Sequence, residues 1–109
     1  MMLKIVPTPE FSKQVKKLAK AYKLIVKDLQ TLKDELVKNP RVGIDLGHNC
    51  YKIRLANSSI PTGKSGGFRI ITYYFDANET IRLLLIYSKT QQENISNEEI
   101  LEVIKRNEF

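Results

Sequence analysis

The stretch of sequence that decides the fold runs from Cys50 to Lys89 and reads CYKIRLANSSIPTGKSGGFRIITYYFDANETIRLLLIYSK. Apolar and cationic side chains alternate over residues 50–56, and residues 68–75 are mostly β-branched or aromatic, as is typical of strands. Residues 80–87 are apolar on both faces, which is typical of an interior strand. Loops rich in glycine, serine, proline, asparagine or aspartate separate these runs. The stretch therefore predicts three strands of an antiparallel meander.

Two amphipathic helices are predicted ahead of this stretch. Thr8 is a candidate N-cap and Pro9 suits the first helical position. Apolar residues then recur at helical spacing, and a second such stripe runs from Ile25 to Leu36. Because the linker between the two stripes is short, we expect an antiparallel helical hairpin, which ends at Asn39-Pro40.

The two ends of the chain complete the predicted fold. Leu3–Val6 is a short apolar run that predicts a strand before the hairpin. Ser96 and Glu99 form a capping box that begins a last helix. The sequence thus predicts an α+β fold: an N-terminal strand, an antiparallel helical hairpin, a β-meander sheet of about four strands, and a C-terminal helix.

Length and composition fit one globular domain over residues 1–109. No apolar run approaches the ~20 residues of a membrane span, and the first residues lack the long apolar segment of a signal peptide. The single cysteine, Cys50, cannot form an internal disulfide and is interpreted as a small packed hydrophobic residue. We therefore expect a cytoplasmic protein.

Positive charge is unevenly distributed along the chain. The formal net charge is +6, made up of +5 over residues 1–40, +4 over residues 41–92 and −3 over residues 93–109. A cationic body indicates a partner that is a nucleic acid, a membrane surface or an acidic protein, and charge alone does not choose among these.

Five cations lie within or beside the predicted strands, with tyrosines near them. They are Lys52, Arg54, Lys64, Arg69 and Lys89. Lys52 and Arg54 share a face of one strand because they are two residues apart, and Tyr87 and Lys89 share a face for the same reason. Each residue taken alone also suits a solvated strand face or ordinary packing. Together they predict a sheet that presents a cationic surface to a polyanion.

Several kinds of active site find no support in the sequence. The single histidine, His48, lies in a glycine-flanked loop, and no group of His and Cys has the spacing of metal ligands. Gly63-Lys64-Ser65 resembles the end of a phosphate-binding P-loop. However, position 58 is serine rather than glycine, and a strand follows where a helix is required. We therefore expect a site that uses neither a metal nor another cofactor.

Cationic side chains can support the cleavage of RNA by its own 2′-OH. That reaction needs a base for the 2′-OH, positive charge on the pentavalent phosphate, and an acid for the leaving oxygen. Lysine acts as a base where neighbouring cations lower its pKa, and arginine offers a planar fork to phosphate oxygens. These functions are available among the cations and tyrosines of the predicted sheet.

Three segments carry a resemblance to a known family: Tyr51–Leu55, the turn and strand from Gly63 to Ile71, and Ile86–Lys89. Together they resemble the RelE/ParE superfamily of bacterial toxins, most closely the RelE- and HigB-type toxins with a Gly-Lys-Ser-Gly-Gly-aromatic-Arg turn. The resemblance extends over nearly the whole chain. It implies a toxin of a type II toxin–antitoxin system, a ribosome-dependent mRNA endonuclease that inhibits translation.

The same resemblance implies roles for individual residues. Lys52 and Arg54 match paired basic strand positions, with Lys52 as the base. Arg69 matches the arginine that steadies the phosphate. Lys64 in the turn and Lys89 at the end of the last strand match positions that contact RNA.

Two positions depart from the family pattern. Thr90 stands where many members have an arginine, and Ser96 stands where a tyrosine often supplies an acid or stacking group. Because Ser96 is already explained as a helix cap, Tyr87 is the candidate acid.

Two other functions stay open. A ParE-type DNA gyrase inhibitor would act through the helical hairpin, and a non-catalytic basic module would bind nucleic acid without cleaving it. Because a free cationic nuclease would harm its host, we expect a cognate antitoxin that joins this chain in a hetero-oligomer. The ribosome and mRNA are the other expected partners, and no membrane partner is expected.

Overall fold

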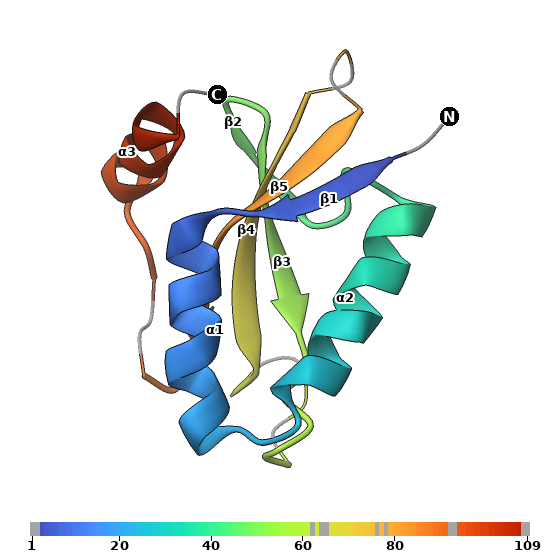
Figure 1. The fold of residues 1–109 in the computed structure, drawn as a ribbon, viewed down its shortest axis with the longest axis vertical. Coiled ribbons are helices and arrows are strands. Elements are labelled where there is room, and N and C mark those ends of the chain that lie inside the picture. The colour runs from blue at the N-terminus through green and yellow to red at the C-terminus, as the bar shows by residue number, and fades with distance from the viewer. Residues whose placement is uncertain are drawn as a thin grey trace.

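A five-stranded sheet carries two helices on one face and a third helix on the other (Figure 1). The computed structural model describes residues 3–61, 63, 66–75, 77, 79–91 and 94–107. Its elements are β1 (Lys4–Pro7), α1 (Pro9–Ala21), α2 (Ile25–Lys38), β2 (Ile44–Gly47), β3 (Cys50–Leu55), β4 (Phe68–Phe75), β5 (Thr80–Ser88) and α3 (Asn97–Arg106). The predicted α+β fold is confirmed.

The sheet has the strand order β1-β5-β4-β3-β2. Strands β2 to β5 form the antiparallel meander, and β1 extends it by pairing in parallel with β5. The parallel pairing aligns Lys4 with Thr80 and Pro7 with Leu83. Since β5 lies between β1 and β4, the interior position predicted for residues 80–87 is confirmed.

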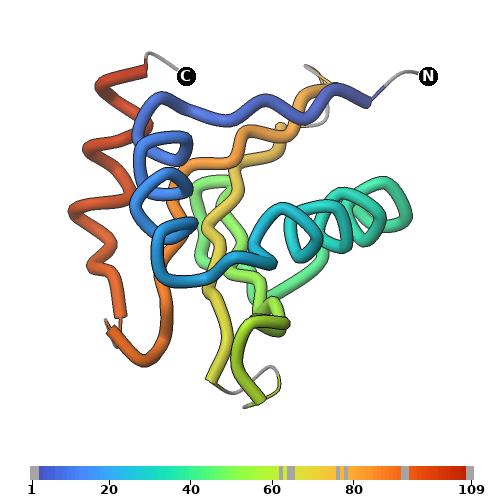
Figure 2. The backbone as a smooth tube through the Cα atoms, turned by 60° about the horizontal axis from the view of Figure 1, so that its bottom comes forward, coloured from blue at the N-terminus to red at the C-terminus, as the bar shows by residue number. Residues whose placement is uncertain are grey.

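The helices α1 and α2 run in opposite directions and splay apart from the short linker between them (Figures 1 and 2). Thr8 caps α1, because its hydroxyl accepts a hydrogen bond from the Phe11 amide at 3.0 Å and donates one to the Leu84 carbonyl at 2.9 Å. At the other end of the pair, α2 ends at Lys38 with Asn39 as its C-cap. Both predicted helix boundaries are confirmed.

The main core lies between this helical pair and the sheet. Its largest fully buried side chains are Ile25, Leu32, Leu36, Ile53, Phe68, Ile70, Ile81 and Ile86. The Phe68 ring meets Tyr22 edge to face, with 5.6 Å between ring centroids. Within the described part of the chain, no helix is long and apolar enough to cross a membrane.

Helix α3 covers part of the opposite face. Ile100 and Val103 are buried there against Cys50, Ile71 and Leu85. The Ser96 hydroxyl caps the helix by accepting a hydrogen bond from the Glu99 amide at 3.1 Å, as the capping box predicts.

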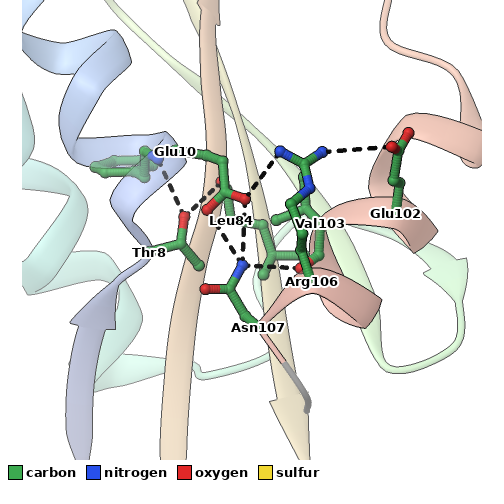
Figure 3. Close-up of polar contacts among 8 residues, drawn as sticks. Thr8, Glu10, Leu84, Glu102, Val103, Arg106 and Asn107 are labelled. Carbon is green, nitrogen blue, oxygen red and sulfur yellow. Dashed lines mark hydrogen bonds and ion pairs between the residues drawn. The ribbon is translucent and has the colours of Figure 1, made fainter.

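The far end of α3 is fastened to the start of α1 (Figure 3). The Asn107 amide nitrogen donates to Glu10 at 3.1 Å and to the Val103 carbonyl at 2.8 Å. Arg106 forms an ion pair with the same Glu10 carboxylate at 3.4 Å. These contacts hold the C-terminal end of α3 beside the start of α1.

A buried carboxylate ties α2 to the loop that follows β3. Asp28 is 3% exposed, and its oxygens accept hydrogen bonds from the Ser58 amide, at 2.9 Å, and from the Ser58 hydroxyl. Charge-assisted hydrogen bonds of this kind hold a loop more strongly than neutral ones.

Replacing Asp28 with alanine is expected to lower the free energy of unfolding by about 2–3 kcal/mol, because it leaves the Ser58 donors without their charged acceptor. Urea unfolding followed by circular dichroism measures the change. The control is Asp34→Ala, at an exposed position of the same helix, where a change within about 0.5 kcal/mol is expected. Equal effects of the two substitutions would contradict the role given to Asp28.

Cys50 behaves as a packed side chain. The residue is 1% exposed, and burial, with a smaller effect of the Asp45 charge, raises the pKa of its thiol to about 11. Since the thiolate is the reactive form, we expect folded protein at pH 8 to react slowly with an aromatic disulfide reagent and unfolded protein to react fast. Equal absorbance traces for the two would contradict this burial.

Candidate functional site

One row of side chains crosses three strands on the sheet face that carries α3. Strand pairing places Arg54 directly opposite Arg69, and Arg69 directly opposite Tyr87. Direct cross-strand neighbours have Cβ atoms about 4.5–5.5 Å apart. In these three residues, called here the cross-strand row, Arg69 therefore lies within contact range of both Arg54 and Tyr87.

Lys52 lies two residues before Arg54 on β3 and so faces the same side of the sheet. Its amine donates a hydrogen bond to the Asn94 side-chain oxygen at 3.3 Å. Asn94 belongs to the segment that leads into α3. The path of that segment therefore brings an amide side chain to the edge of the candidate site.

The two arginines of the row have like charges in direct opposition. Such a pair is unfavourable on a sheet unless an anion lies near it. Arg69 is 5% exposed, whereas Arg54 is exposed. Burial lowers the pKa of Arg69, the Arg54 charge lowers it further, and Tyr87 opposes both effects. A phosphate between the two guanidinium groups would remove the repulsion.

The hydroxyl of Tyr87 is buried without a hydrogen-bond partner among the described residues. Burial raises the pKa of Tyr87, and the Arg69 charge partly offsets this. The phenol is therefore protonated at neutral pH and able to donate. A buried polar group of this kind calls for an explanation, and an anionic ligand at the row supplies one.

Gly67 explains how the turn reaches the row. A Cβ at this position would lie 2.2 Å from the Leu55 carbonyl oxygen, so only glycine allows the chain to pass this close to β3. The Lys89 amide donates to the Gly67 carbonyl at 2.9 Å, which extends the β4–β5 pairing by one step. This places Lys89 next to the end of the row.

The structure thus brings together Lys52, Arg54, Arg69 and Tyr87, with Lys89 beside them. Lys64, the remaining candidate from the sequence, lies outside the described residues.

Sequence reasoning missed two contacts, one at the end of β5 on the face that carries the helical pair and one at Lys52. Tyr22 reaches the end of β5, where its hydroxyl lies 3.4 Å from both the Ser88 and the Thr90 hydroxyls, and these contacts lower its pKa. The second involves Asn94, whose side-chain oxygen accepts the hydrogen bond from Lys52. Tyr22 belongs to an apolar helical stripe, so its spacing indicated packing only, and nothing in the sequence pattern connects Asn94 to Lys52.

Comparisons with known proteins agree with this architecture. The family model described as "RelE toxin of RelE / RelB toxin-antitoxin system" matches residues 8–107. A free E. coli RelE toxin with two arginine-to-alanine substitutions is 19% identical, with a TM-score of 0.62 over 97% of this chain and 98% of its own. The intact E. coli RelBE toxin–antitoxin complex is 19% identical, with a TM-score of 0.59 over 80% of this chain and 96% of the matched chain. No curated protein sequence matches significantly.

The solved structures support the fold, and the family model spans every element from α1 to α3. The chain therefore belongs to the RelE family, toxins of RelE/RelB toxin–antitoxin systems.

Proposed function

We propose that this toxin is an endoribonuclease that cleaves mRNA on the ribosome and so inhibits translation. The observation that carries the proposal is the cross-strand row, in which two arginines and one tyrosine, whose hydroxyl has no hydrogen-bond partner among the described residues, lie on adjacent strands of one sheet face. A phosphodiester is the anion that this combination suits, because guanidinium binds phosphate oxygens in a fork and a protonated phenol can donate to a leaving oxygen.

Each step of the reaction has a candidate residue. The Lys52 amine takes the proton of the 2′-OH, whose oxygen attacks the adjacent phosphorus. Arg54 and Arg69 stabilise the charge that develops on the phosphate oxygens. As the bond to the 5′-oxygen breaks, Tyr87 gives that oxygen its proton. The products are a 2′,3′-cyclic phosphate and a 5′-hydroxyl.

Lys89 and Lys64 serve the same proposal as contacts to the RNA backbone. Lys89 follows the last strand at the end of the row. Backbone contacts of this kind raise affinity without reading sequence, and they weaken as salt rises.

An antitoxin is the proposed protein partner. The intact E. coli RelBE complex, whose toxin shares this fold, contains the corresponding pair of proteins. A neutralising partner is also expected, because a free cationic nuclease would act on its host's RNA. We therefore expect this chain to be isolated in a toxin–antitoxin hetero-oligomer.

A translation extract supplied with the purified toxin tests the proposal. Arrested translation with new, discrete mRNA ends is the expected result. Arrest without new ends would point to binding alone. Toxicity in cells that survives the double substitution Lys52→Ala/Arg69→Ala and comes with DNA damage signalling would instead favour gyrase inhibition through the helical pair.

A further inference from the structure

A groove beside the candidate site has no role in the proposed chemistry so far. It encloses about 330 Å³ and is lined by Glu35, Val42, Gly43, Ile44, Lys52, Ile53 and Arg54. This volume falls within the range of small-molecule sites, about 300–1,000 Å³. Figure 1 shows the two elements that flank it, with α2 standing alongside β3. Because Lys52 and Arg54 line the groove and also belong to the candidate site, the groove borders that site along the edge of β3.

The groove exists because of two local features of the backbone. Among the described residues, β2 pairs with β3 only as far as Lys52, so the outer edge of β3 beyond it has no partner strand. Gly43 has a φ of +105°, and a Cβ there would lie 2.4 Å from the Lys52 carbonyl oxygen. Glycine at this position therefore lets the chain pass close to the backbone of β3 at the start of the groove.

The walls of the groove combine apolar surface with one carboxylate. Ile44 is 55% exposed, which leaves a large aliphatic surface without cover, and the half-buried Val42 also lines the groove. Flat apolar surfaces of this kind hold the face of an unpaired nucleobase. Glu35, half-buried at the end of α2, supplies an acceptor-only group at the rim.

We propose that this groove binds the base of the nucleotide that carries the attacking 2′-OH, and that Glu35 selects guanine there. The inference rests on the proposed function, since Lys52 is the base for that 2′-OH and also lines the groove. Guanine is the base with two adjacent donors, N1–H and N2–H, on its Watson–Crick edge, and these match the two oxygens of a carboxylate. Single-stranded RNA exposes this edge for reading.

The first experiment maps cleavage sites on a mixed-sequence mRNA for the wild type, Glu35→Gln and Asp34→Asn. The wild type is expected to cleave on the 3′ side of guanine about tenfold more often than after other bases, within the discrimination that a bidentate pair gives. Glu35→Gln is expected to lose most of this preference, because cleavage after guanine falls toward the rate seen after the other bases. Asp34→Asn, an exposed neighbour on the same helix, keeps the wild-type pattern. Base preference that is absent, or unchanged by Glu35→Gln, overturns the inference.

A second readout does not depend on catalysis. Methyl NMR signals of Val42, Ile44 and Ile53 are followed while guanosine 3′-monophosphate or uridine 3′-monophosphate is added to the wild-type chain. The guanosine nucleotide is expected to shift these signals at about tenfold lower concentration than the uridine nucleotide, and Glu35→Gln removes the difference. Shifts without any mRNA cleavage would support base binding in the groove and contradict the proposed function. Cleavage with no shift of these methyl signals would support the proposed function and contradict base binding in the groove.

Discussion

Replacing Arg69 with alanine is expected to reduce mRNA cleavage by about 10²–10³-fold, the usual cost of removing one fixed group that stabilises charge in a transition state. Arg69 stands between Arg54 and Tyr87 in the strand register, so it can reach a phosphate held by either neighbour. Its burial also strengthens each electrostatic contact it makes. The rate of appearance of new mRNA ends in a translation extract measures the loss.

Arg82→Ala is the matched control. Arg82 lies on the same pair of strands, opposite Tyr73 and far from the row, and its loss is expected to leave cleavage within about twofold. Circular dichroism verifies that both variants are folded. If Arg69→Ala is folded and cleaves at the wild-type rate, the row is not the catalytic centre.

Replacing Tyr87 with phenylalanine is expected to change activity and stability in opposite directions. A positioned general acid contributes about 10²–10⁴-fold to a rate, so cleavage should fall by at least about 10²-fold. The hydroxyl is buried without a partner among the described residues. Its removal should therefore leave the free energy of unfolding unchanged or raise it by about 1 kcal/mol.

The two measurements together separate a catalytic tyrosine from a structural one. Urea unfolding gives the free energy, and mRNA end mapping gives the rate. A structural role predicts the reverse pattern, with lower stability and wild-type cleavage. Because burial raises the pKa of Tyr87, the phenol keeps its proton as pH rises, and activity should not fall between pH 7 and 8 through loss of this proton.

Local sequence signals predicted the boundaries of the helices well. Thr8, Asn39 and Ser96 each act within one helical turn, so their roles depend on nearby residues alone. The parallel pairing of β1 with β5 joins residues more than seventy positions apart, and no local pattern indicates such a partner. The same holds for Asp28, whose burial is explained only by Ser58 across the fold.

The candidate site was predictable in its residue types and faces, because alternation along β3 places Lys52 and Arg54 together. The strand register was not. A turn of different length would move Arg69 away from Arg54, and only the three-dimensional pairing places these two residues opposite each other. The role proposed for Glu35 could not be predicted from the sequence either. Glu35 lies on an amphipathic helix, where a charged residue off the apolar stripe indicates only a solvated side chain.

The chemical identity of the RNA ends tests the central claim most directly, namely that cationic side chains and a phenol drive attack by the 2′-OH. Purified wild-type toxin in a translation extract is expected to produce 2′,3′-cyclic phosphates and 5′-hydroxyls at each cleavage site. A 2′-deoxy substitution at a mapped site should abolish cleavage there. Fragments ending in 5′-phosphate and 3′-hydroxyl, or cleavage that survives the 2′-deoxy substitution, would contradict the account.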